Sequence, residues 1–350
     1  MEGLKEGARV APGSLPLTDP IGSVREQFAA FPEIPAWPQL PRFSSGDRTG
    51  FQELKGMPLL TWPKPEEPVL NTDHPGFEDV AELLRTENRT GPFDRGAFEH
   101  DDAPGFFAFV REAAALSGPD ILAVKGQCAG PVTLGLCVKD GYGKPLLSSR
   151  EGMEALREYL LLHMRWQVSR LVTIRKPVVF FLDEPALGST FEPSRYGLSW
   201  PELRDWYGPL LQPLQESGVV AGIHCCGPGP WPWIDSTPME MFHFDDRYLS
   251  THEGDAPGLG RFLGQGGLLV WGMIPTDPMS DRGSASEVLR AWEGGVDRLV
   301  SAGIDRDLLT GRSVFSTACG LGGLSVDAAA EAVRQLHAFT RLWREKWVRK

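Results

Sequence analysis

The stretch GVVAGIHCCG, from Gly218 to Gly227, carries the pattern that decides the fold. Its apolar first half is typical of a buried strand, and a Gly/Pro cluster ends that strand after Cys226. Alternate side chains of a strand lie on the same face, so His224 and Cys226 are expected to point one way, and Ile223 and Cys225 the other. The sequence therefore predicts a His-x-Cys pair at the end of a buried strand.

Seven other apolar runs end in turn residues in the same way. Continuous apolar character is typical of strands that are covered on both faces, as in a parallel sheet. Together with the helical stretches between them, the eight runs predict an α/β fold: a single-domain (β/α)8 TIM barrel over residues 1–350, with a doubly wound open sheet as the alternative. The seven runs are ARVAPGSLP (8–16), EIPAWPQLP (33–41), ILAVKGQCAGPVTL (121–134), PVVFFLDEP (177–185), MEMFHFDD (239–246), GLLVWGMIPTD (267–277) and SVFSTACGLG (313–322).

Two helical stretches are the most regular. Apolar residues recur at spacings of three and four between 153 and 171, and a closing helix is expected over 326–343, with Ser325 as its N-cap. The stretch 42–104 interrupts the rhythm, because it is rich in Pro, Gly and charge and has only a short helical piece near 78–85. We expect it to be an insertion between the second and third strands that lies over the barrel mouth as a lid.

Composition excludes several classes of function. The 350 residues carry a formal net charge of -11 without basic runs, which argues against a nucleic-acid partner. No apolar stretch approaches the roughly 18 residues that a membrane helix needs. Five cysteines, an odd number, do not indicate a disulfide framework. The first residues lack the pattern of a secretion signal, so we expect a cytoplasmic protein with a small-molecule partner.

Polar side chains gather where the predicted strands end, and the carboxyl ends of the strands are where a parallel barrel has its active site. Three of them, His224, Cys226 and Cys319, form an imidazole and thiolate set suited to tetrahedral Zn²⁺. His243 and Asp245 share a face of the sixth strand, so either is placed to be the fourth ligand. We favour Asp245 because it lies nearer the strand end.

The charge of this ligand set indicates the chemistry. Two thiolates cancel the charge of zinc, and a carboxylate makes the site anionic, which is unfavourable for Lewis-acid activation of water or a carbonyl. A substrate thiol that binds such a site stays deprotonated, and its sulfur stays electron-rich and nucleophilic. The ligand set therefore favours alkyl transfer to sulfur.

Five short motifs occur in one order along the chain: GSLP, GPVT, LDEPAL, IHCCG and ACGLG. From about residue 9 to the end, the chain resembles the C-terminal catalytic half of cobalamin-independent methionine synthase. It is similar, more loosely, to the uroporphyrinogen decarboxylase superfamily and its zinc-dependent corrinoid:coenzyme M methyltransferases. The resemblance implies a (β/α)8 barrel with zinc on His224, Cys226 and Cys319, and with Asp245 in place of the family's glutamate ligand.

The resemblance also implies a homocysteine site. Asp183 matches the aspartate that binds the amino group of homocysteine, and Gly13 and Ser14 match the segment that receives its carboxylate. Where the synthases have a Gly-Glu after the second strand, this chain has WPQLP, with Gln39 nearby, so the match to homocysteine is incomplete. The chain lacks the extra N-terminal barrel of the long synthases, which favours a methylated corrinoid or corrinoid protein as the donor over a folate.

These observations predict a zinc-dependent methyltransferase in which the thiolate of homocysteine attacks a methyl group, giving methionine, with Asp183 and His224 as catalytic residues. One alternative is methyl transfer to another thiol, such as coenzyme M. A second is a metal-free decarboxylase of the uroporphyrinogen type, which the acidic and thiol-bearing motifs disfavour. A third is a binding module that carries a corrinoid or a metal without turnover.

Several residues have simpler interpretations. Cys225, Cys128 and Cys137 are expected to be small buried apolar side chains. Of the neighbours Asp183 and Glu184, one is expected to face the mouth while the other pairs with a basic side chain.

Four residues in the loops after the strands have open or bland interpretations. Trp231 and Trp233 either flank a flat cofactor or cover the barrel edge. His252 is expected to be solvated, and Asp277 either lines the pocket or caps a helix.

Overall fold

A parallel sheet forms the centre of the molecule. The computed structural model describes residues 6–43, 52–116, 118–188, 191–228, 233–277, 280 and 283–348. Six strands pair in chain order, each parallel to the next, and each lies within one of the predicted apolar runs. The predicted α/β class with a parallel sheet is therefore confirmed. The strands are β3 (Val124–Ala129), β4 (Val178–Asp183), β5 (Val220–Cys225), β6 (Met241–Asp245), β7 (Leu268–Ile274) and β8 (Ser313–Thr317).

The first two predicted strands are extended segments without regular ladders. Residue Arg9 forms an isolated parallel bridge to Phe315 of β8, and Ala36 forms one to Lys125 of β3. Bridges from Val10 to Ile34 and from Ser14 to Gln39 connect the two segments to each other. The prediction of full strands here was wrong in extent, because the prolines within 8–16 and 33–41 remove the N–H donors that a ladder needs.

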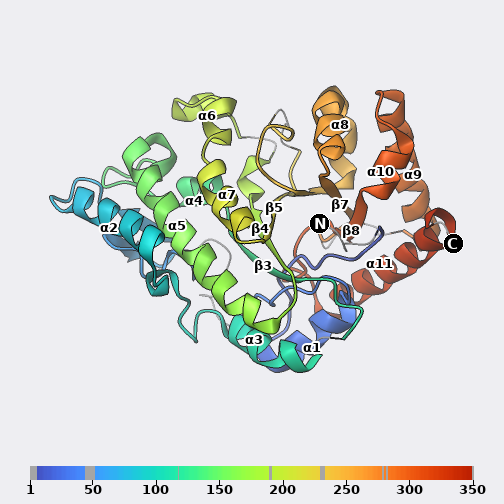
Figure 1. Cartoon of the computed structure of the whole chain (residues 1–350), viewed down its shortest axis with the longest axis horizontal. Helices are drawn as coiled ribbons and strands as arrows, with labels where there is room; N and C mark the ends of the chain where they lie inside the picture. The colour runs from blue at the N-terminus through green and yellow to red at the C-terminus, as the bar shows by residue number, and fades with distance from the viewer. Residues whose placement is uncertain are drawn as a thin grey trace.

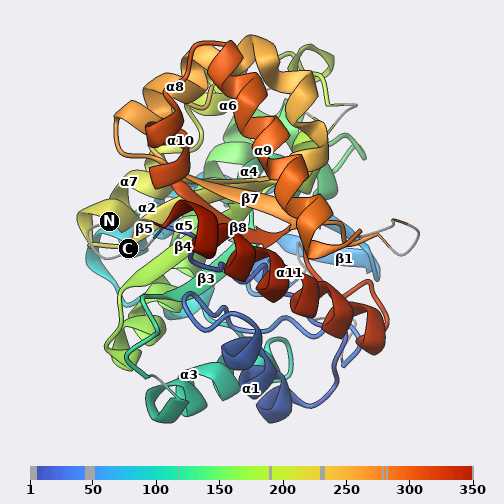
Figure 2. The same ribbon diagram turned by 90° about the vertical axis from the view of Figure 1, so that its right-hand side faces the viewer.

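Helices cover the outer side of the sheet (Figure 1). In Figure 1, α1 and α3 lie together at the lower edge, α2 and α5 on the left and α9 to α11 on the right. Figure 2 shows α11 crossing the molecule beside α9. The helices are α1 (Pro20–Ala30), α2 (Phe77–Thr90), α3 (Pro104–Leu116), α4 (Pro131–Cys137), α5 (Arg150–Leu171), α6 (Trp200–Arg204), α7 (Gly208–Glu216), α8 (Ala256–Gly264), α9 (Ala285–Ser301), α10 (Arg306–Gly311) and α11 (Val326–Trp347).

Local signals explain where the long helices begin. The predicted cap of the closing helix is confirmed, because the Ser325 side chain accepts the Ala328 N–H at the start of α11. A reciprocal capping box of Ser284 and Glu287 begins α9. Among the described helices, none combines the length and the apolar character needed to cross a membrane.

The stretch 42–104 has more structure than the sequence indicated. It contains an antiparallel hairpin, β1 (Leu60–Lys64) and β2 (Glu67–Leu70), and the 14-residue α2 in place of one short helical piece. The helix α2 packs against α5, where the Asn88 side chain donates to the Glu158 carbonyl at 2.8 Å. Residues 44–51 lie outside the described residues, so the expected lid over the mouth stays a prediction.

The two faces of the sheet bury different side chains. A large apolar cluster fills the space between the strands and the helices, and a smaller one lies on the opposite face. On β4, Val179 and Phe181 belong to the smaller cluster, and Asp183 follows them at the same period of two. The polar residues at the strand ends therefore continue this apolar face, which directs them to one common site.

Candidate metal centre

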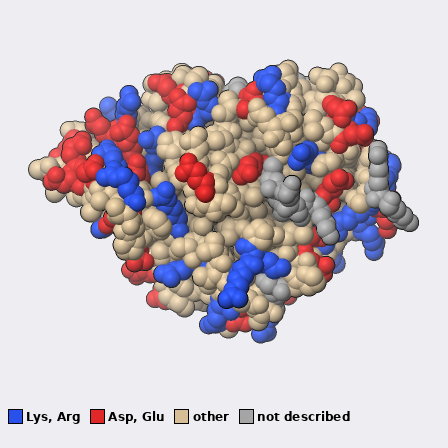
Figure 3. Space-filling model, viewed as in Figure 1, with Lys and Arg blue, Asp and Glu red and all other residues tan. Residues whose placement is uncertain are grey.

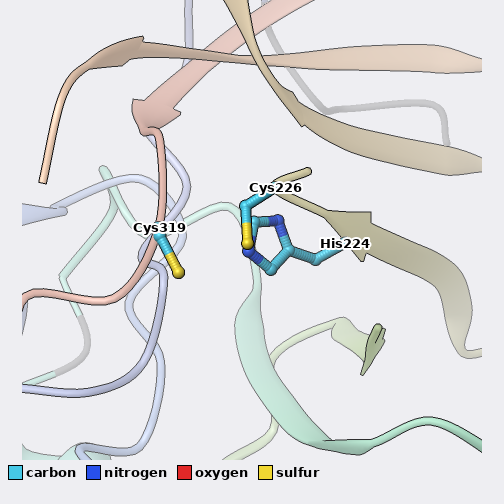
Figure 4. Close-up of side chains that lie close together, drawn as sticks. All are labelled: His224, Cys226 and Cys319. Atoms are coloured by element: carbon cyan, nitrogen blue, oxygen red, sulfur yellow. The ribbon is translucent and has the colours of Figure 1, made fainter. Parts of the chain in front are cut away.

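Three potential metal ligands meet at the carboxyl ends of two strands. His224 is the fifth residue of β5, Cys226 directly follows that strand, and Cys319 lies two residues after β8. One ligand atom from each lies within 4.8 Å of the others. Figure 4 shows the two sulfurs directed toward the same space beside the imidazole ring. The structure thus brings together the His/Cys/Cys set that the sequence singled out, across more than 90 residues of chain.

The two sulfurs are not equivalent. The proximity of the Cys226 thiol lowers the pKa of Cys319, and the neighbouring His224 lowers it further against the opposing effect of burial. The same contact and burial raise the pKa of Cys226. Cys319 is therefore the sulfur that ionises first, and a thiolate is the form that binds a metal.

The imidazole of His224 has the environment expected of a metal ligand. It is buried, and among the described residues neither Nδ1 nor Nε2 has a hydrogen-bond partner. A buried polar group without a partner costs about 1–3 kcal/mol, and an ion bound at this imidazole would remove that cost. Burial opposes protonation of His224, but the nearby Cys319 sulfur outweighs it and raises the pKa. One nitrogen and two sulfurs form the donor set that Zn²⁺ prefers, so these residues fit that ion.

Asp245, the expected fourth ligand, does not belong to this group. Its carboxylate is buried and accepts three side-chain hydrogen bonds from Arg247, the shortest 2.7 Å, and a fourth from the Arg247 backbone N–H at 3.0 Å. Arg247 also donates to Asp277 at 2.7 Å and to Ser280 at 3.1 Å. Arginine binds carboxylates with two parallel bonds, and here that pairing occupies both oxygens of Asp245. Asp277 belongs to the same network, and its hydrogen bonds from Ser280 and Arg247 hold its pKa at about 2.

His243, the other expected candidate, packs against the cluster and stays outside it. It is in register with His224 on the neighbouring strand, and the two ring centroids are 4.1 Å apart. Its Nε2 is 2.9 Å from the Thr317 carbonyl, an acceptor that places a proton on this nitrogen. Burial lowers the pKa of His243 well below its usual value, so the ring is neutral at physiological pH. His243 therefore supports the His224 ring by packing.

A buried carboxylate and a buried ammonium lie beneath the cluster. Asp183 is 8% exposed, and its Oδ1 has no hydrogen-bond partner among the described residues. Burial raises its pKa, while the charges of Lys125 and His224 lower it. The Lys125 Nζ donates to the Pro12 carbonyl at 3.2 Å and to Gln127 Oε1 at 3.4 Å, and burial lowers its pKa to about 8. Sequence reasoning missed Lys125, although a lysine within an apolar run that must be covered on both faces is itself a signal.

Glu184 has a structural role that differs from the expected ion pair with a basic residue. Its carboxylate accepts the backbone N–H groups of Val132 and Thr133, at 3.0 and 2.8 Å, and the hydroxyls of Thr133 and Tyr207. The acceptor lies at the start of α4, where free N–H groups and the helix dipole favour a negative charge. Close approach also requires Gly130, because a Cβ there would lie 2.3 Å from this carboxylate. The GPVT and LDEPAL motifs are thus joined by one buried carboxylate.

The Gly13–Ser14 segment lies between two parts of the site. Gly13 has φ +120, and a Cβ on it would lie 2.9 Å from Gln127 Nε2. The Gly322 N–H donates to Ser14 Oγ at 3.3 Å, which joins Ser14 to the loop that carries Cys319. Gln39 is buried and bridges Ser14 through the backbone. The structure therefore places Ser14 beside the loop of Cys319, with Gly13 next to it in the chain and Gln39 paired to it through the backbone.

Another buried carboxylate comes from the stretch 42–104. Glu53 is 1% exposed, and its Oε1 accepts the Ala129 N–H at 3.2 Å, at the end of β3. Sequence reasoning missed it, because no period or motif connects residue 53 with a strand that begins 71 positions later.

Solvent exposure distinguishes the roles of the remaining cysteines and of Trp233. Cys128 and Cys225 are buried, as expected, whereas Cys137 is exposed at the end of α4, whose buried residues precede it. Trp233 is buried in the large apolar cluster and stacks with Tyr207, which matches its expected role of covering the barrel edge. Trp231 and the side chain of His252 lie outside the described residues.

Comparison with solved structures shows a likeness that covers almost the whole chain. No protein-family model and no curated protein sequence matches this chain. Among solved structures, a B12-independent methionine synthase from Shewanella sp. W3-18-1, in complex with selenomethionine, is similar with a TM-score of 0.61 and 12% sequence identity. The alignment covers 98% of this chain and 99% of that one.

This chain has the fold of a methionine synthase. The resemblance inferred from five short motifs is thereby confirmed for the fold. Because the alignment covers nearly all of both chains, the two chains are similar in length. At 12% identity, the chemistry must be argued from the residues of this chain.

Proposed function

We propose that this protein is a zinc-dependent methyltransferase that transfers a methyl group to the thiol of homocysteine and forms methionine. The observation that carries the proposal is the cluster of His224, Cys226 and Cys319, with both nitrogens of the imidazole unpaired among the described residues. The likeness to a B12-independent methionine synthase supports the same reaction class.

His224, Cys226 and Cys319 would hold the zinc ion, and bound zinc supplies deprotonation of a substrate thiol near neutral pH. With these three protein ligands, a bound ion would have room to take the substrate sulfur as well. The ion pair with Arg247 cancels the charge of Asp245, so two thiolates alone balance the metal. The site would thus be neutral, in contrast to the anionic ligand set expected from the sequence.

Asp183 is suited to bind the ammonium group of homocysteine. It is a buried carboxylate with an unpartnered oxygen at the end of β4, in register with His224 on β5. The nearby charge of Lys125 favours its ionised form. The substrate carboxylate would lie at Gly13 and Ser14, with Gln39 beside them. An amine-bearing thiol therefore fits this site better than coenzyme M, which has no amine.

The reaction itself is a displacement at carbon. The substrate sulfur attacks the methyl carbon, a sulfur–carbon bond forms, and the bond from the methyl group to its donor breaks with its electron pair remaining on the donor. The residues contribute by holding the sulfur and the ammonium group of the substrate in one orientation. Such positioning accounts for a large part of the rate enhancement in group transfers. The structural neighbour is named as B12-independent, which gives no support to the corrinoid donor expected from the sequence.

We also propose that the sheet closes into a (β/α)8 barrel within a single domain. The extended segments around residues 10 and 36 bridge each other, and they bridge β8 on one side and β3 on the other. Backbone hydrogen bonds from Val10 to Phe315 and from Trp37 to Lys125 support the same ring. A closed ring would place every strand end at one mouth, as the proposed chemistry requires.

Metal analysis combined with turnover tests the proposal. Purified wild-type protein and Cys319→Ser would be analysed for zinc, then assayed for methionine from homocysteine with methyltetrahydrofolate or methylcobalamin. We expect near-stoichiometric zinc in the wild type, its loss in the variant, and methionine with one of the donors. Absence of zinc would favour the metal-free decarboxylase, and zinc without turnover would favour a carrier protein.

A further inference from the structure

A group of arginines lines a cavity on the outer side of the molecule. Helix α11 presents Arg334, His337, Arg341 and Arg344 at spacings of three and four residues, so they share one face of the helix. Arg9, from the first extended segment, completes the group. The cavity measures about 490 Å³, which lies within the range of small-molecule sites.

This cavity lies away from the thiol cluster. The Arg344 side chain donates to the Gly7 carbonyl at 2.8 Å, and the Gly7 N–H bonds to Ser313, the first residue of β8. Cys319 follows the opposite end of that strand. The arginine cavity is therefore near the amino ends of the strands, while the candidate metal centre is at their carboxyl ends.

The cavity carries an excess of positive charge. Arg9 and Arg344 share the single carboxylate of Glu33, at 2.8 and 2.6 Å, and Arg334 pairs with Glu331 at 2.7 Å. Arg341 is exposed and forms no ion pair with any residue in the described part of the chain. Four guanidinium groups thus face two carboxylates, in a protein whose formal net charge is -11. On the face of the molecule drawn in Figure 3, by comparison, basic and acidic side chains are interspersed.

Two of the guanidinium groups are held in place before any ligand binds. Arg9 donates through Nε and Nη2 to the two oxygens of Glu33, and its side chain is only 12% exposed. Arg344 is held by Glu33 and by the Gly7 carbonyl. His337 adds no cation, because its Nε2 contacts the Ala30 carbonyl at 2.6 Å and burial lowers its pKa. Oriented guanidinium groups lose little freedom when they bind an anion, which favours affinity.

We propose that this cavity binds a small molecule through a phosphate group. A phosphate monoester is nearly a dianion at neutral pH, which matches the excess of two positive charges, and its oxygens accept the paired N–H groups of arginine. The cavity volume is sufficient for a nucleotide-sized ligand. The binding site is independent of the proposed methyl transfer, because its residues do not contribute to the metal centre.

Binding of defined anions to the full-length protein tests this inference. Isothermal titration at constant ionic strength would compare inorganic phosphate, adenosine monophosphate and succinate. We expect both phosphate compounds to bind, and succinate to bind more weakly because it lacks the phosphate oxygens. Stronger binding of the nucleotide than of inorganic phosphate would identify a phosphorylated small molecule as the ligand class, and equal binding would identify free phosphate.

A pair of arginine variants makes the test specific. Arg341→Gln removes the guanidinium that has no ion pair within the described residues, and we expect about a tenfold loss of phosphate affinity, as for a lost charged hydrogen bond. Arg290→Gln, on the exposed side of α9, removes the same charge elsewhere and should leave the affinity unchanged. Equal affinity of all three proteins, or no phosphate binding by the wild type, would overturn the inference, whatever the zinc content is.

Discussion

Replacement of Lys125 by methionine gives a quantitative test of the buried site. Lys125 is 1% exposed, contacts the Phe181 ring at 5.1 Å and has a pKa of about 8, against 10.5 for a free lysine. Between these two pH values the unfolded chain binds more protons than the folded protein, so stability rises with pH there. Burial of the charged Lys125 side chain therefore destabilises the folded protein by about 3 kcal/mol at pH 7. This destabilisation is fully present below pH 8 and is lost above pH 10.5.

Lys125→Met removes this charge. Because the loss of the hydrogen bond to Pro12 offsets part of the gain, we expect the variant to be as stable as the wild type at pH 7, or more stable by up to about 3 kcal/mol. Urea denaturation from pH 7 to 10 measures the difference in the free energy of unfolding. The advantage of the variant should shrink as pH rises from 8 toward 10.

The control is Lys144→Met, which removes an exposed lysine and should leave the pH profile of stability parallel to that of the wild type. Parallel profiles for wild type and Lys125→Met would refute the reasoning, since they would mean that Lys125 stays fully protonated in the folded protein up to its ordinary pKa. In the same variant, homocysteine should bind more weakly, because Asp183 loses the cation that favours its ionised form.

Three further predictions concern individual contacts. Cys319→Ser should lose stoichiometric zinc on elemental analysis, whereas Cys137→Ser, at an exposed thiol, should retain it. Arg247→Ala should lower the free energy of unfolding by about 1–3 kcal/mol, because it leaves the buried Asp245 carboxylate without its half-exposed partner, and an unchanged free energy of unfolding by urea denaturation would contradict this. Glu184→Gln places an amide donor against N–H and O–H donors, so we expect a loss of about 1–3 kcal/mol in the same assay; an unchanged midpoint would show that these bonds contribute little.

The sequence alone was sufficient for the class of fold and for the central cluster. Strands form where apolar runs occur, because burial on both faces is a local property of the side chains. The period of two then places His224 and Cys226 on one face of the predicted strand, and the rule that sites lie at the carboxyl ends of parallel strands brings Cys319 to the same place. These steps need only near neighbours in the chain and one general property of parallel sheets.

Tertiary structure decided what the side chains do once they meet. Asp245 and Arg247 are two residues apart, yet only the folded loops show that the arginine also reaches Asp277 and so holds both carboxylates. The arginine cavity assembles from residue 9 and from residues more than 320 positions later. Hydrogen bonds and ion pairs act over a few ångströms in space, whereas the patterns that a sequence displays report the periodicity of single strands and helices, so partners from distant elements become visible only after folding.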